Sequence, residues 1–127
     1  MNWESIALAT ATVLLPYLTK AGEAAAQKIG QDVYSWLKGH FQSKNDQDAL
    51  GAVTALENDP QSKARLTVLS ETIEKRAQAD PENFGIELSK LVERLKNEPG
   101  SVGHTVKVTI NTITARDVGM INQGNEY

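Results

Sequence analysis

The chain has 127 residues, 40% of them hydrophobic and 23% charged, and a net charge of −3. These values fit one small domain with or without a tail, and they exclude global disorder and a strongly basic nucleic-acid binder. With no cysteine and two histidines, the chain excludes a disulfide framework, a thiol nucleophile and a cysteine-based zinc site, and leaves little material for a histidine-rich metal site or a Ser-His-Asp triad. We expect no enzyme, no cofactor, no metal and no nucleic-acid partner.

The N-terminal stretch from Ser5 to Thr19 carries no charge and reads SIALATATVLLPYLT. As a helix it would be about 22 Å long, which is shorter than the roughly 30 Å hydrocarbon core of a bilayer. The residues before it lack the basic region of a secretory signal, so we expect a cytoplasmic protein. Pro16 should end or kink the helix near Leu15.

Two interpretations of this uncharged stretch remain open. It could be a buried first helix of the core, or a segment that inserts into a membrane or drives oligomerisation. In the second case its apolar side chains would enter the bilayer, and the rings of Trp3 and Tyr17 would lie at the interface. The candidate membrane-insertion residues are Trp3, Ile6, Leu8, Val13, Leu14, Leu15, Tyr17 and Leu18.

Apolar residues at helical spacing predict further helices between residues 20 and 97. In the first, His40 lies near the end and is expected to pack or to compensate the helix dipole. Asp59-Pro60 and Asp80-Pro81 each combine an N-cap residue with a proline at the first helical position, so each predicts a helix start. The charges between the apolar positions indicate solvated faces. We predict an all-α fold, a four- to five-helix bundle over residues 1–97.

Residues 98–127 differ from the bundle because β-branched residues are dense and charges are few. Val106, Val108 and Ile110 alternate with polar residues, which predicts a strand. The following segment combines apolar residues, amides and glycines, a composition that suits cross-β stacking. Fibril, hairpin on the bundle and pairing with another chain all remain open. The candidate amyloid residues are Ala115, Val118, Gly119, Met120, Ile121, Asn122, Gln123, Gly124 and Asn125.

Several of these segments resemble a known family. The segment from Leu14 to Lys38, LLPYLTKAGEAAAQKIGQDVYSWLK, resembles the start of bacterial Bell domains, and the two Asp-Pro helix starts fit that style of protein. The segment from Ala115 to Asn125 is similar to bacterial amyloid signalling motifs related to the RHIM of necroptosis proteins. It differs from a RHIM core, since Ile121-Asn122-Gln123-Gly124 keeps only the first and last residue types.

Bell domains are considered counterparts of fungal HeLo and HeLo-like domains and of the helical domain of MLKL-type effectors. The resemblance implies a membrane-targeting helical toxin domain with an amyloid switch. A matching motif on a partner such as an NLR-like receptor would template the tail into a homo-oligomeric fibril. Clustering would then release the N-terminal helix, and the cytoplasmic protein would associate with the membrane and permeabilise it. The alternative is a helical adaptor that docks a partner through its C-terminal strand, without membrane activity.

Overall fold

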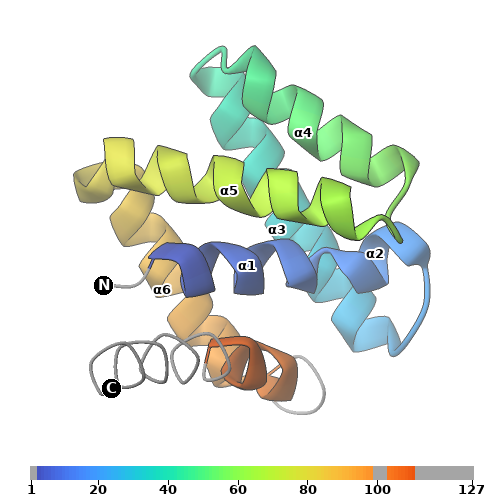
Figure 1. Cartoon of the computed structure of the whole chain (residues 1–127). Coiled ribbons are helices and arrows are strands. Elements are labelled where there is room, and N and C mark those ends of the chain that lie inside the picture. The colour runs from blue at the N-terminus through green and yellow to red at the C-terminus, as the bar shows by residue number, and fades with distance from the viewer. Residues whose placement is uncertain (1–2, 99–102, 111–127) are drawn as a thin grey trace, which may run out of the picture.

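A computed structural model describes residues 3–98 and 103–110 of the chain. In this part the fold is all-α (Figure 1), as the sequence predicts for residues 1–97, and it contains no strand. The helices are α1 (Trp3–Val13), α2 (Leu15–Thr19), α3 (Ala24–Ser43), α4 (Gln47–Asn58), α5 (Lys63–Ala79), the π-helical turn η1 (Pro81–Gly85), α6 (Ile86–Lys96) and a short helix over residues 103–110.

Helix α1 lies at the centre of the bundle. It runs alongside α5 along most of its length and also packs against α3 and α6 (Figure 1). Helix α2 continues from α1 and packs on α3, while α4 packs on α3 and α5. Every helix except α2 contributes fully buried apolar side chains to one core, and Leu14, between α1 and α2, adds another. The largest of the helical ones are Phe41, Phe84, Leu37, Leu56, Leu69, Ile73 and Leu88.

The predicted break in the N-terminal stretch is confirmed. The chain forms two helices rather than one, because Pro16 has no N–H to donate to the carbonyl of Thr12. Helix α1 ends at Val13 and α2 begins at Leu15, with Leu14 between them. This division accounts for six α-helices over residues 3–98 where the sequence pattern predicts four or five.

One predicted helix start is wrong. Asp59 ends α4 instead of beginning the next helix, since its backbone N–H donates to the carbonyls of Ala55 and Leu56. Helix α5 begins at Lys63, three residues after the predicted first helical residue, Pro60. Its N-cap is Ser62, whose side chain accepts a hydrogen bond from the backbone N–H of Arg65 at 3.2 Å. A serine whose hydroxyl reaches the third helical N–H is the stronger cap, so Pro60 stays in the turn.

The helix start predicted at Asp80-Pro81 is at the right position, but the helix that begins there is not an α-helix in its first turn. Pro81 opens a helical segment after Asp80, as expected, yet its first turn is π-helical and widens the helix before α6 begins. The backbone N–H of Gly85 donates to the carbonyl of Asp80 at 2.9 Å, five residues back. This wide turn directs the fully buried Phe84 into the core.

The predicted strand at Val106, Val108 and Ile110 is also wrong, because residues 103–110 form a helix. Val106 is fully buried and Ile110 packs against the core, whereas Val108 is 46% exposed. The four-residue spacing of Val106 and Ile110 puts both on one helical face, so burial against the bundle outweighs the strand preference of β-branched residues.

Candidate functional site: the N-terminal segment

The predicted membrane-insertion residues lie together on α1 and α2, which we call the N-terminal segment (Trp3–Thr19). In this structure each of them is partly or fully buried. Val13 and Leu14 are buried, and the other six are half-buried. Four of these six pack against the core: Trp3, Ile6, Leu15 and Leu18. The interpretation as a buried first helix therefore describes this conformation.

Small side chains allow α1 to occupy the centre of the bundle. Ala7, Ala9 and Ala11 are at most 1% exposed, and Ser5 and Thr10 are also buried. Residues of this size let neighbouring helices approach closely on several sides at once, in water as in lipid. Because these side chains are small, each one buries little apolar area. Helix α1 is therefore enclosed on many sides, while each contact contributes only a modest stabilisation.

The threonines of the N-terminal segment satisfy their hydroxyl groups within the helices. Thr10 donates to the carbonyl of Ile6 at 2.9 Å, Thr12 to that of Leu8 at 2.7 Å and Thr19 to that of Leu15 at 2.7 Å. Each bond returns to the preceding turn and depends on no other helix. These hydroxyls therefore keep a partner whether the surroundings are protein core, water or hydrocarbon.

Two glycines hold the ends of the N-terminal segment. At Gly30 of α3, a Cβ atom would lie 2.8 Å from the carbonyl oxygen of Val13 and 2.9 Å from the Cβ of Tyr17. At Gly85, a Cβ atom would lie 2.8 Å from the six-membered ring of Trp3. Real Cβ atoms essentially never approach so closely, so both contacts require glycine. The sequence pattern does not reveal the contact of Gly85 with Trp3.

The turn after the segment has an unusual backbone. Lys20 has a φ of 57° and Gly22 a φ of 86°, both in the left-handed region, before α3 begins at Ala24. A lysine there is strained by about 1 kcal/mol or more, whereas glycine adopts this region freely. Both residues are exposed, so this turn connects the N-terminal segment to α3 through few packing contacts.

A hydrogen-bonded group ties α2, α3 and α4 together. The hydroxyl of Tyr34 donates to a carboxylate oxygen of Glu57, and the ammonium of Lys38 donates to the Tyr34 hydroxyl at 3.2 Å. The ring of Tyr17 lies 5.4 Å from that of Tyr34, centre to centre. Partial burial, and secondly the bond to Glu57, raises the pKa of Tyr34 above its ordinary value. The phenol is thus held neutral as a donor between the helices.

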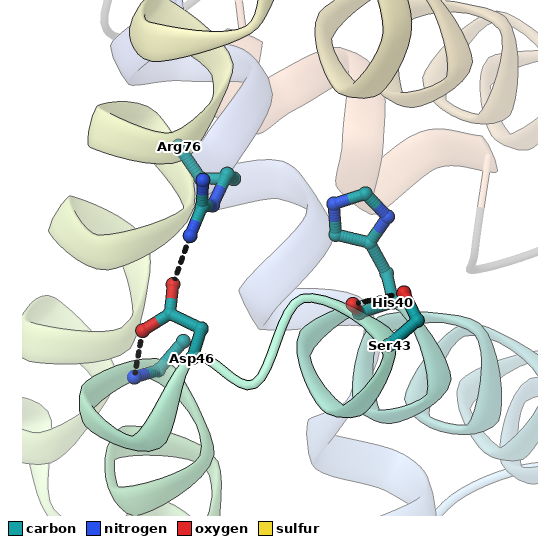
Figure 2. Close-up of polar contacts among 5 residues, drawn as sticks. His40, Ser43, Asp46 and Arg76 are labelled. Atoms are coloured by element: carbon teal, nitrogen blue, oxygen red, sulfur yellow. Dashed lines mark hydrogen bonds and ion pairs between the residues drawn. The ribbon is translucent and has the colours of Figure 1, made fainter.

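An ion pair joins the start of α4 to α5. A carboxylate oxygen of Asp46 lies 2.5 Å from a guanidinium nitrogen of Arg76, and its other oxygen accepts from the backbone N–H of Ala49 (Figure 2). The Arg76 bond, followed by that from Ala49, lowers the pKa of Asp46 below its usual value. Sequence reasoning treated the charges as solvated faces and missed this pair, although an aspartate directly before a helix is a recognisable cap.

His40 lies beside this pair, in an aromatic cluster between α3 and η1. Its ring centre is 4.5 Å from that of Phe84, and Trp36 stacks on Phe84 at 5.5 Å. In the described part of the chain its buried Nε2 has no hydrogen-bond partner. Burial first, and the nearby Arg76 charge second, lowers the pKa of His40 below its ordinary value. The prediction of a packing role for His40 agrees with this arrangement.

Within residues 3–98 and 103–110 no group of three histidine, cysteine, aspartate or glutamate side chains is placed to hold a metal ion. No helix in the same ranges is long and apolar enough to cross a membrane. The candidate amyloid residues, from Ala115 to Asn125, lie outside the described residues, and the amyloid motif stays a prediction.

Comparison with known families matches residues 1–126 to the family described as the Het-E N-terminal domain. The chain belongs to this family. It is a cell-death domain family related to the fungal HET and HeLo domains, so the match indicates a role related to heterokaryon incompatibility and cell death. The finer resemblances, to Bell domains and to the RHIM, stay predictions. No curated protein and no solved structure matches the chain.

Proposed function

We propose that this Het-E N-terminal domain is an amyloid-controlled cell-death effector that acts without catalysis. A partner with a matching motif, of the NLR-like receptor kind, templates the segment from Ala115 to Asn125 into a cross-β fibril. The fibril clusters many helical bundles at the cytoplasmic membrane. The N-terminal segment then leaves the bundle and enters the bilayer, which becomes permeable.

The observation that carries this proposal is the packing of the N-terminal segment. A segment without charge from Ser5 to Thr19 is stored at the centre of the bundle, with its threonine hydroxyls bonded internally. Its two ends rest on glycines, and an exposed turn with left-handed backbone follows it. A segment built in this way could move from the protein core into lipid while each of these threonine hydroxyls kept its hydrogen bond.

The length of the segment explains why clustering belongs to the mechanism. Helix α1 has 11 residues and α2 has 5, so α1 is about 16 Å long and α2 about 8 Å, against a hydrocarbon core of roughly 30 Å. A single copy would therefore bind lipid weakly. Many copies on one fibril would raise the effective concentration at the bilayer, so that weak insertions add together.

The test of membrane activity needs a charge that leaves the bundle folded. Leu14 is fully buried, and a lysine there would unfold the core, whereas Leu8 is half-buried and is a better site. We expect Leu8→Lys to abolish dye release from vesicles of mixed anionic and zwitterionic lipid while fibrils still form. Val68→Lys, on an α5 residue that is 51% exposed, is the matched control and should retain release.

The test of the amyloid step uses Gly119→Pro in the full chain. We expect thioflavin-positive fibrils with cross-β diffraction from the unsubstituted protein and none from the variant, because proline cannot join a stacked ladder. A chain that forms fibrils with a partner but never releases dye would replace the effector with the adaptor alternative. A chain that stays monomeric at high concentration would refute the amyloid step.

A further inference from the structure

A groove of about 550 Å³ runs between α3 and α6. Its floor is apolar and consists of Ile29, Val33, Trp36, Leu91 and Leu95. Both helices pack on α1, so the groove lies where two neighbours of the central helix leave room between them. Tryptophan on a groove floor is a common anchor of protein interfaces.

The charged residues at this edge of the groove are Glu87, Lys90 and Arg94 of α6 and Glu98 just beyond its end. Glu87, Lys90, Leu91 and Arg94 follow one another at spacings of three, one and three residues, so they form one helical stripe. The acidic residue is at the N-terminal end of this stripe and the basic residue Arg94 at the other. Both ends are exposed, and within residues 3–98 and 103–110 neither Glu87 nor Arg94 belongs to an ion pair.

A stripe with opposite charges at its two ends is complementary to an antiparallel copy of itself. A two-fold axis midway between Lys90 and Leu91 leaves Glu87 and Arg94 equally far from it along the helix, about three and a half residues on either side. Glu87 would then face Arg94 of the second copy, and Arg94 would face its Glu87, so both pairings are favourable. On α3, Asp32 also lines the groove; it is two-thirds exposed and pairs with Lys28 of the same helix at 3.4 Å.

We propose that the groove is a homodimer interface in which α6 of a second copy lies antiparallel between α3 and α6. By symmetry each α6 would occupy the groove of the other copy, and α3 and α6 of both copies would form a four-helix layer. An isologous contact of this kind closes on itself and gives a dimer rather than an open filament. It is therefore a step distinct from cross-β stacking of the tail, and it does not depend on the proposed function.

Sedimentation velocity of the freshly prepared full chain over a range of concentrations tests this proposal. We expect a reversible species of twice the 13.8 kDa chain mass, separate from any fibril that pellets. Glu87→Lys and Arg94→Glu, each alone, should weaken the dimer by about tenfold or more, since each places like charges opposite one another twice. The double variant should restore the dissociation constant to within about threefold of the original, because both pairs reform with reversed signs.

The apolar floor is tested separately. Leu91→Asp should leave a monomer at all concentrations, whereas Val68→Asp should leave the dimer intact, because Val68 is an exposed residue of α5 that does not line the groove. Circular dichroism should show both variants folded. A full chain that sediments as a monomer throughout would overturn the proposal. A dimer that survives Leu91→Asp, or a double charge variant no better than the single ones, would place the interface elsewhere.

Discussion

The seating of the N-terminal segment on Gly30 leads to a prediction about a single methyl group. In Gly30→Ala, the new Cβ would lie 2.8 Å from the carbonyl oxygen of Val13 and 2.9 Å from the Cβ of Tyr17. Both of these atoms belong to the backbone or lie next to it, so relief requires α2 to move away from α3. Such overpacking costs about 1–3 kcal/mol.

A matched substitution in the same helix isolates that cost. Gly39 has no heavy atom within 4 Å of its Cβ position, so Gly39→Ala should stabilise the protein by up to about 1 kcal/mol through helix propensity alone. Gly30→Ala gains the same propensity but adds the overpacking. The two variants should therefore differ by about 1–3 kcal/mol, or roughly 4–12 °C in Tm at about 4 °C per kcal/mol.

Thermal and urea unfolding followed by far-UV circular dichroism provide the measurement. The free energy of unfolding should be lower for Gly30→Ala than for Gly39→Ala. The urea m-value should be the same for both, because both variants fold to the same bundle. If Gly30→Ala proves as stable as Gly39→Ala, α2 does not rest on α3 as described, and the reasoning that the segment is held at this end fails.

Three further outcomes follow from the polar and aromatic contacts. Burial lowers the pKa of His40 in the folded state, so its contribution to stability should be complete above about pH 6.5 and should be lost as the pH falls through the folded pKa. In His40→Leu, the free energy of unfolding measured with urea should therefore depend less on pH between about pH 7 and 5. An unchanged pH dependence would contradict this. Asp46→Asn should lower the free energy of unfolding by about 1 kcal/mol at pH 7, and this difference from the unsubstituted protein should shrink as the pH falls through the lowered pKa of Asp46. An equal difference at pH 2 would exclude the ion pair with Arg76 as its source. Gly85→Ala should displace the indole of Trp3 and shift its fluorescence to longer wavelength, and an unshifted spectrum would show that the ring is not seated there.

The helices of this fold could be predicted from the sequence because their apolar residues keep a regular spacing. The break at Pro16 could be predicted for the same kind of local reason, since a missing N–H acts on the preceding turn. The start of α5 was misplaced because two caps compete within four residues, and only the hydrogen bond from Arg65 to Ser62 decides between them. The strand predicted at Val106 failed because burial, not local preference, determines its conformation.

The site could be predicted only in part. Lack of charge identified the N-terminal segment, but its enclosure by α3, α5 and α6 depends on contacts between residues far apart in the chain. The role of Gly85 depends on Trp3, which lies more than eighty positions earlier, and no local pattern reveals such a pair. The contact between His40 and Phe84 is of the same kind.

In the proposed fibril, the short helix over residues 103–110 would set part of the distance between the bundle and the stacked tail. As a helix its eight residues span about 12 Å, whereas the same residues fully extended would span about 26 Å. Unwinding it requires withdrawing Val106 from the core, the one fully buried apolar side chain that the helix contributes. Unwinding this helix would therefore lengthen the connection by about 14 Å, which in the proposed fibril would give crowded bundles room to reorient around the fibril axis.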